Sequence, residues 1–302
     1  MKQILILDAS QISTAYECNE KYNLSYRQNL TQISDSLDEP VDAGTYGHKL
    51  LEVYYKNLNQ GVNVAVAKAL AIDINKLKEH FVSDLTPDMI KRVKERFGNY
   101  WMHYHDKDIR ELDIIRKQKL VIESNGNGEF IDKIIQEPLI EKGFSVPLLD
   151  TPEYLFVLEG KIDMIARTLL GVSFIDNKWQ FRERDLYPKS VQFKSYALAT
   201  GLKTGMINYI RLKKNFDETT LQRQPISFNP MELNYWKQEL IEFYIKIAKS
   251  IRVGEWSHNW DLCAGKFGYK CMFTSICEEY NPRIRESLKK VNFRKRKEWK
   301  PW

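Results

Sequence analysis

The sequence lacks any apolar run long enough to cross a membrane, and its first ten residues contain too short an apolar run for a signal peptide. It also lacks a G-x-x-x-x-G-K-[ST] phosphate-binding loop, so this chain does not itself drive ATP-dependent unwinding of a duplex. It has no flavin motif and no recognisable base-reading module. These absences lead us to expect a cytoplasmic protein without a membrane partner or a nucleotide cofactor.

Cysteine is scarce, with only Cys18, Cys263, Cys271 and Cys277 in 302 residues. Disulfides are disfavoured in the cytoplasm, and three of the four cysteines lie close together near one end, which favours metal or cluster ligation. Four thiolates suit a tetrahedral zinc ion or an iron–sulfur cluster, and spacing alone does not discriminate between them. His258 is a spare ligand that would suit zinc, and four unligated buried thiols are the remaining alternative.

The composition is that of an ordinary globular protein, with 43% hydrophobic and 28% charged residues, and the length allows one large or two small domains. The net charge of +6 is concentrated at one end. Residues 283–302 contain nine Lys or Arg and two Glu, which leaves a net charge of −1 on the first 282 residues. This basic tail, with Phe293, Trp299 and Trp302, suits phosphates and stacked bases, or is a partly disordered, solubilising end.

Two apolar, β-branched runs, Val157 to Arg167 and Gly171 to Lys178, predict a β-hairpin. Asp176 and Lys178 share one face of the second strand, and Asp163 can lie opposite them. Two close carboxylates repel one another, and a divalent cation relieves that repulsion. A cation beside a lysine suits phosphodiester hydrolysis, although an isolated D-x-K sequence is more often a surface ion pair.

Two predicted helices carry further polar side chains at a spacing of four residues, which places each pair on one helix face. The first runs from about Tyr46 to Asn57 and carries His48, which can reach a metal held by the hairpin, and Glu52, which either supports that site or is polar surface. The second runs from Pro188 to Thr200 and carries Gln192 and Tyr196, which can hold a nucleic-acid phosphate or the lysine.

The remaining pattern predicts other elements around these. We expect helices at 11–26 (capped by Ser10), through most of 61–135 (with an N-cap at Thr86 before Pro87) and at 231–251, strands at 138–148 and 206–212, a loop at 124–128 that ends the insertion, and a polar loop at 213–229. His103 and His105 suggest a zinc site, but residues two apart on a helix do not face one direction.

Several of these motifs together resemble the PD-(D/E)XK nuclease superfamily. They are GTYGH at 44–48, GKID at 160–163, IDNK at 175–178, and the Q-x-x-x-Y of Gln192 and Tyr196. The chain is most similar to the RecB-like branch with an iron–sulfur cluster, which includes CRISPR-associated adaptation exonucleases and phage exonucleases. The C-x5-C of Cys271 and Cys277 resembles that branch's C-terminal cluster motif, but seven residues separate Cys263 from Cys271 where the usual pattern has two.

The resemblance implies an α/β fold with a restriction-endonuclease-like core, a mixed central sheet flanked by helices. It implies N-terminal core helices at 1–58, a helical insertion at 59–135, a catalytic core at 136–215, a C-terminal helix and cysteine cluster at 216–282, and the basic tail at 283–302. A [4Fe-4S] cluster, or alternatively Zn²⁺, would join Cys18 in the first helix to Cys263, Cys271 and Cys277, with a structural role.

The resemblance also implies the chemistry. His48, Asp163, Asp176 and the carbonyl of Asn177 would bind Mg²⁺ or Mn²⁺, Lys178 would orient or activate water, and Gln192 and Tyr196 would place the scissile phosphate. We therefore predict a DNA nuclease, and an exonuclease in preference to a sequence-specific endonuclease, which acts on single strands or free ends with a possible helicase or recombination partner. The alternatives are a catalytically silent DNA-binding partner and a zinc-stabilised RNA-processing nuclease.

Overall fold

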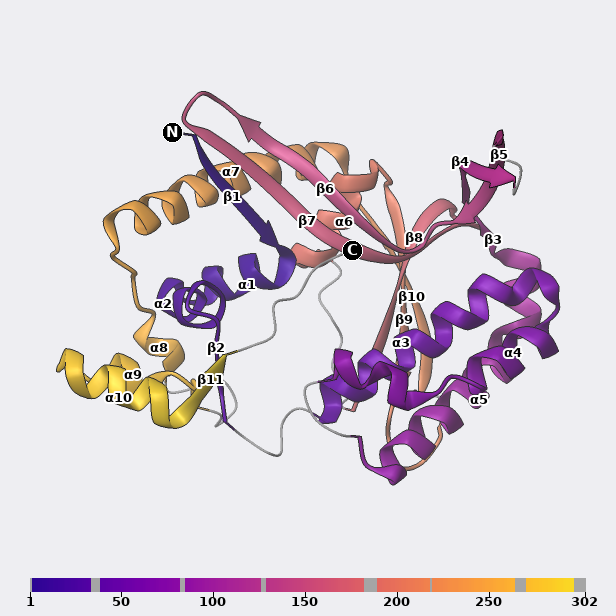
Figure 1. The fold of residues 1–302 in the computed structure, drawn as a ribbon, viewed down its shortest axis with the longest axis horizontal. Coiled ribbons are helices and arrows are strands. Elements are labelled where there is room, and N and C mark those ends of the chain that lie inside the picture. Colours follow the sequence, from indigo (N-terminus) through magenta and orange to yellow (C-terminus); the bar gives the residue numbers. More distant parts are fainter. Residues whose placement is uncertain are drawn as a thin grey trace.

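The structure is a computed structural model that describes residues 2–33, 39–81, 85–125, 129–181, 189–217, 219–263 and 270–295. Among these residues, every helix is too short or too polar to span a lipid bilayer. The chain forms a mixed central sheet with helices on both faces (Figure 1).

The central sheet has the strand order β1-β7-β8-β9-β10, and β3 and β6 pair with the other edge of the long strand β7. Its strands are β1 (Gln3–Asp8), β3 (Asp113–Ile114), β6 (Ile140–Asp150), β7 (Tyr154–Thr168), β8 (Gly171–Gln180), β9 (Thr204–Arg211) and β10 (Leu221–Ser227). The pairs β1–β7 and β8–β9 are parallel, and the other pairs are antiparallel. β7 is therefore the strand on which both halves of the sheet are built.

Helices cover the two faces of this sheet (Figure 1). They are α1 (Ala9–Glu17), α2 (Asn19–Tyr22), α3 (Glu39–Asn57), α4 (Val62–Leu70), α5 (Pro87–Glu111), α6 (Val191–Thr200), α7 (Pro230–Val253), α8 (Trp260–Cys263), α9 (Thr274–Cys277) and α10 (Pro282–Asn292). Ile175 of β8 packs with α3, α4 and α5, whereas the adjacent Phe174 packs with α6. Because neighbouring strand residues point to opposite faces, α3 and α6 lie on opposite sides of β8.

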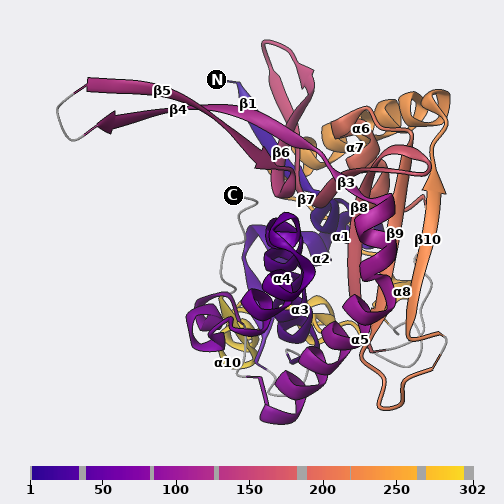
Figure 2. The ribbon, with the colours of Figure 1, turned by 90° about the vertical axis from the view of Figure 1, so that its right-hand side faces the viewer.

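Short elements complete the chain. A π-helical turn, η1 (Asn23–Arg27), follows α2, and two 3-10 turns, η2 (Leu58–Gln60) and η3 (Ile74–His80), flank α4. Strands β2 (Leu30–Gln32) and β11 (Phe293–Lys295) pair with each other. Strands β4 (Arg116–Asn125) and β5 (Glu129–Pro138) form a separate antiparallel ribbon that extends away from the body of the protein (Figure 2).

The predicted core is confirmed in its order: a helix (α3), three strands (β6, β7, β8), a helix (α6) and a strand (β9). The hairpin of β7 and β8 forms as expected, with Met164 paired to Ile175 and Thr168 to Gly171. The predicted N-cap of α5 is also present, since the Thr86 hydroxyl accepts a hydrogen bond from the backbone N–H of Met89.

Two sequence-based predictions of helices are wrong. The helix predicted at 11–26 begins earlier, because Asp8 forms its N-terminal cap, and it is interrupted at Cys18, whose backbone is extended. The apolar residues that precede it, for which no element was predicted, form the strand β1, whose Leu5 and Leu7 are buried. The helical insertion is helical only as far as Glu111, since the ribbon of β4 and β5 occupies most of its remainder.

The polar loop predicted at 213–229 contains the edge strand β10. Its polar residues are typical of a loop, but Arg223 is partly buried and paired with Asp108. Pro225 is tolerated because β10 lies at the edge of the sheet. In the basic tail, residues 283–295 form most of α10 and β11, whereas Trp299 and Trp302 lie outside the described residues. Residues 126–128 of the loop predicted at 124–128 also lie outside the described residues.

Candidate active site

His48 reaches the sheet because α3 lies close against β8. A Cβ atom at Gly47 would be 2.3 Å from the ring of Trp179, so only glycine lets the helix approach this closely. Trp179 follows Lys178 directly in β8. The GTYGH sequence thus has a steric basis, in which Gly47 brings the next residue, His48, to the carboxylates of the hairpin.

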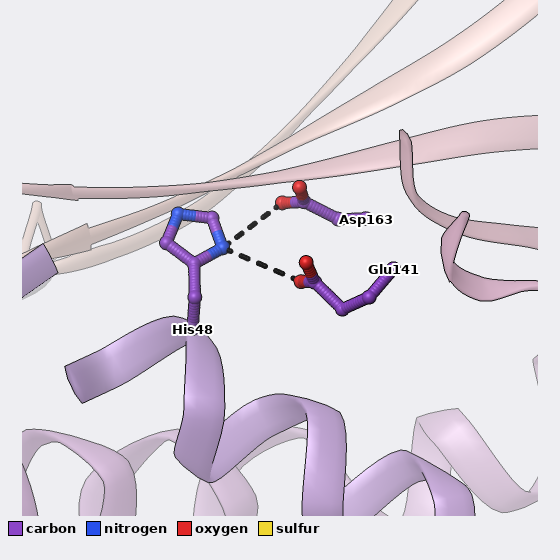
Figure 3. A group of neighbouring side chains, drawn as sticks. All are labelled: His48, Glu141 and Asp163. Atoms are coloured by element: carbon purple, nitrogen blue, oxygen red, sulfur yellow. Dashed lines mark ion pairs between the residues drawn. The ribbon is translucent and has the colours of Figure 1, made fainter. Parts of the chain in front are cut away.

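The centre of the site is a group of three side chains from three elements, His48 of α3, Glu141 of β6 and Asp163 of β7 (Figure 3). Nδ1 of His48 is 3.3 Å from Oδ2 of Asp163 and 3.9 Å from Oε1 of Glu141. One ligand atom from each lies within 4.8 Å of the others. An imidazole and two carboxylates at this spacing can bind one divalent cation.

Glu141 takes its place through an unusual backbone conformation. Its φ of 53° lies in the left-handed region, which is uncommon for a residue other than glycine. Ile140 pairs with Met164 and Lys142 with Ile162, so Glu141 lies opposite Asp163 across the strands. Backbone strain of this kind is typical of functional sites. Nζ of Lys161 is 2.5 Å from the other carboxylate oxygen of Glu141 and holds it in place.

The three groups perturb one another's protonation. Burial alone would lower the pKa of His48, but the neighbouring Asp163 carboxylate raises it above its usual value. Burial alone would raise the pKa of Asp163, but His48 lowers it below its usual value, with help from Lys178 and the backbone N–H of Asn177. For Glu141, burial and the charge of Asp163 both raise the pKa. The site therefore concentrates negative charge that a cation would offset.

Asp176 lies beside this group and is fully buried. Its Oδ1 accepts hydrogen bonds from Nζ of Lys178 (3.1 Å), Nε2 of Gln192 (3.0 Å) and the hydroxyl of Tyr196 (3.3 Å). Its Oδ2 is 2.8 Å from Nζ of Lys178 but accepts no well-aligned hydrogen bond from the described residues. Burial raises the pKa of Asp176 to about 6, although Lys178 opposes the shift.

Gln192 connects the lysine to the helix behind it. Its Oε1 accepts a hydrogen bond from Nζ of Lys178 at 3.0 Å, and its Nε2 donates to the hydroxyl of Tyr196 at 2.7 Å. Both residues face β8 from α6, as their spacing of four predicts. Of the two roles expected for them, the contact with the lysine is the one present in the structure.

The structure therefore brings together His48, Asp163, Asp176, Lys178, Gln192 and Tyr196, and the backbone N–H of Asn177 donates to Oδ2 of Asp163 at 2.7 Å. Glu52 is paired with Lys49 and Lys56 on its own helix, and its charge also acts on Lys161, which holds Glu141. Sequence reasoning missed Glu141, which it treated only as a strand residue. Its position on the strand expected next to the GKID strand was the only indication in the sequence. The left-handed backbone conformation of Glu141 could not be predicted from the sequence.

His103 and His105 of α5 were not expected to share a zinc ion, and His105 makes local contacts on its own helix. Nδ1 of His105 is 3.1 Å from the backbone carbonyl of Trp101, and its ring stacks edge-on against that tryptophan. A cavity of about 750 Å³ lies near this helix, but its lining includes none of the catalytic carboxylates.

The four cysteines lie where the N- and C-terminal segments of the chain meet. Cys18 lies between α1 and α2, and its Sγ is 4.0 Å from the carbonyl of Ser257. The backbone N–H of Cys271 donates to the carbonyl of Cys263 at 3.2 Å. A small core of Leu24, Leu30, Phe273, Ile276, Cys277 and Phe293 lies beside them.

All four thiols are free, and they lie close enough to affect one another. Burial raises the pKa of Cys263, and so do the neighbouring thiols of Cys271 and Cys18. Burial raises the pKa of Cys277 to about 12, with contributions from Glu20 and from the other thiols. His258 stacks on Trp260, and its Nε2 is buried without a hydrogen-bond partner among the described residues.

Comparison with known proteins assigns the family. A family model described as the PD-(D/E)XK nuclease superfamily matches residues 7–278. The chain belongs to this superfamily. Membership implies metal-dependent nuclease activity on a nucleic-acid substrate, and the matched range contains every residue of the candidate active site.

Two further comparisons accompany this result. A solved structure titled "Crystal structure of SSO0001" is similar to the chain with a TM-score of 0.30 and 9% sequence identity, over 84% of this chain and 78% of that one. No curated protein matches the chain.

Proposed function

We propose that this PD-(D/E)XK superfamily member is a DNA exonuclease that uses Mg²⁺ or Mn²⁺ and serves recombination, repair or another DNA-processing step. The observation that carries the proposal is the convergence of His48, Glu141 and Asp163 within 4.8 Å, beside the ion pair of Asp176 and Lys178. These residues fit a divalent cation, because their carboxylates crowd together and Oδ2 of Asp176 retains an unused lone pair.

In the proposed mechanism, His48, Glu141 and Asp163 hold the cation, joined by Asp176 and by the carbonyl of Asn177. When bound, the cation offsets charge on the scissile phosphate and makes a bound water a better nucleophile. The backbone N–H of Asn177 fixes the orientation of Asp163.

Lys178 has the remaining chemical role. Asp176 and Gln192 hold its ammonium group at the edge of the carboxylate cluster, where it orients the attacking water or contacts a phosphate oxygen. Tyr196 supports both Asp176 and Gln192, and burial raises the pKa of its hydroxyl well above the usual value, so this group stays protonated as a donor.

We propose exonuclease action because the sequence contains no base-reading module that would direct cutting to a particular sequence. The chain also has no phosphate-binding loop, so a separate helicase would supply any unwinding of duplex DNA.

We further propose that Cys18, Cys263, Cys271 and Cys277 hold a structural [4Fe-4S] cluster. The C-x5-C spacing of Cys271 and Cys277 supports a cluster in preference to zinc, and the cluster would join Cys18 to segments separated from it by most of the chain.

End-labelled substrates test the proposed activity. Single-stranded and duplex DNA, each with free ends or with one end blocked, would be incubated with the purified protein and Mn²⁺, with EDTA controls and a matched RNA. We expect stepwise shortening of DNA from a free end that EDTA abolishes. Binding without cutting in Mn²⁺ would refute the nuclease proposal, internal cuts in end-blocked DNA would refute exonuclease action, and a preference for RNA would refute the choice of DNA.

A further inference from the structure

Asn177 is connected to a buried polar network on the face of β8 opposite Lys178. Asn177 and Asn208 are register partners on the parallel strands β8 and β9. Nδ2 of Asn208 donates to Oδ1 of Asn177 at 2.9 Å and to the hydroxyl of Tyr100 at 3.1 Å. Asn177 and Asn208 are 4% and 1% exposed, so neither amide can exchange these partners for water.

The network continues through α3 and α5. The hydroxyls of Tyr100 and Tyr55 are 2.7 Å apart, and the Tyr55 hydroxyl donates to Oδ2 of Asp108 at 3.0 Å. Arg223 of β10 donates to both Asp108 (2.6 Å) and Tyr100 (2.9 Å). Asp108 and Tyr100 are completely buried. A continuous chain of hydrogen bonds thus links the ion pair of Asp108 and Arg223 to Asn177 of β8.

The hydrogen bonds of this network can run in one direction only. The Tyr55 hydroxyl gives its proton to the Asp108 carboxylate, so Tyr55 can only accept from Tyr100. The Tyr100 hydroxyl is then committed as a donor to Tyr55, so it can only accept from Asn208. Asn208 must therefore present its NH₂ group, whose second hydrogen goes to Oδ1 of Asn177.

Asn177 connects this network to the active site. The side chain of Asn177 is held on one face of β8, while its backbone N–H donates to Oδ2 of Asp163 from the same residue. A rotation of the Asn177 amide would break the contact with Asn208 and leave buried polar atoms unpaired, which is costly. The network therefore restrains the residue that orients Asp163.

We propose that Asn208, Tyr100, Tyr55 and Asp108 are positioning residues that set the orientation of Asp163 through Asn177 and so tune cation affinity. The inference rests on the proposed function, because it assigns the network to the same site. None of these four side chains contacts Asp163 in the described hydrogen bonds, so each acts through Asn177. Loss of a group that orients metal ligands typically weakens metal affinity or activity by about 10- to 100-fold.

Two adjacent tyrosines of α3 provide a matched test. Tyr55 belongs to the network, whereas the neighbouring Tyr54 is equally buried but its hydroxyl has no hydrogen-bond partner among the described residues. Tyr55→Phe and Tyr54→Phe each remove one buried hydroxyl from the same helix. Tyr100→Phe is the second network variant, in case Tyr55→Phe is too unstable.

Mn²⁺ binding would be measured without DNA, by the electron paramagnetic resonance signal of the free ion, at a temperature where circular dichroism shows each variant to be folded. The kcat and KM on labelled DNA would be measured as functions of Mn²⁺ concentration. We expect the Kd for Mn²⁺ to rise about tenfold in Tyr55→Phe and Tyr100→Phe, with KM for DNA nearly unchanged, and to change less than about twofold in Tyr54→Phe.

Equal Mn²⁺ affinities in folded Tyr55→Phe, Tyr100→Phe and Tyr54→Phe would overturn the inference, and so would a change confined to KM for DNA. Failure of the proposed function gives a different result, because the unmodified protein itself would then neither bind Mn²⁺ nor cut DNA.

Discussion

The active site and the cysteine region differ in how their reactive groups are supported. At the active site, each acidic group has partners within the chain, and the residues lie on long elements such as the 15-residue strand β7. Cys263, Cys271 and Cys277 lie on or near helices of only four residues, α8 and α9, Cys18 lies between α1 and α2, and no disulfide joins the four cysteines. Long, well-packed elements hold a site without a ligand, whereas short ones need additional bonds.

This difference suggests different roles for the two proposed cofactors, the divalent cation of the active site and the iron–sulfur cluster of the cysteine region. His48, Lys161 and Lys178 already hold the carboxylates of the candidate active site in place, so we expect the site to fold before it binds a cation. The cysteine region joins α2 to α10 through the ion pair of Glu20 with Arg285 and through a small core. We expect the cysteine region to depend on the proposed cluster for its stability, because the free energy of binding the cluster contributes directly to the free energy of folding.

The largest expected effect is the loss of cutting in Asp163→Ala or Lys178→Ala. Each variant removes a group that would act on the cation or the water, so we expect activity to fall at least about 1000-fold, with DNA binding retained. Digestion of labelled DNA and a gel-shift assay measure the two quantities. Thermal unfolding in EDTA is the control for folding, and cutting that persists in a folded variant would contradict the assigned roles.

Cys271→Ser tests whether the stability of the cysteine region depends on the proposed cluster. We expect a colourless protein without visible absorption, in which the segments around Cys18 and Cys277 are cleaved by trypsin about 100-fold faster. Absorption spectra and timed proteolysis measure this. A coloured variant with unchanged resistance would show that Cys271 is not a ligand.

Much of the active site could be predicted because its residues follow strand and helix spacing. Asp176 and Lys178 share a face because they are two apart on a strand, and Gln192 and Tyr196 share one because they are four apart on a helix. Both pairs meet as expected. The hairpin that carries Asp163 also forms as its β-branched pattern indicates.

The remainder depended on contacts that local patterns do not record. Glu141 reaches the site through a left-handed backbone conformation, and nothing in its neighbouring residues signals that conformation. The segment that contains β10 is polar and therefore predicts a loop, whereas in the structure Arg223 of this strand is partly buried and paired with Asp108 from α5. Cys18 interrupts a helix that the apolar spacing makes continuous.

A smaller loss of activity is expected when α3 is moved away from β8. In Gly47→Ala the new methyl group would overlap the ring of Trp179, so the helix must shift and carry His48 with it. Displacements of this order cost up to about 100-fold in catalysis, and we expect roughly a 30-fold loss. Gly98→Ala in α5 is the matched control, because its Cβ would meet no atom within 4 Å. Equal activity in the two variants would contradict the steric explanation.

The smallest effect is a gain in stability, in Asp176→Asn. Burial raises the pKa of Asp176 to about 6, above its unfolded value, so the folded state binds the extra proton and the ionised carboxylate destabilises the fold at neutral pH. The shift corresponds to at most about 3 kcal/mol, and the loss of the charged partner of Lys178 reduces the expected gain to about 1 kcal/mol. Thermal unfolding in EDTA should show this gain at pH 7.5, a decrease as the pH falls through 6, and no gain below about pH 3, where the carboxyl is protonated in both states. A gain that is independent of pH would mean that packing, and not the buried charge, limits the stability of this site.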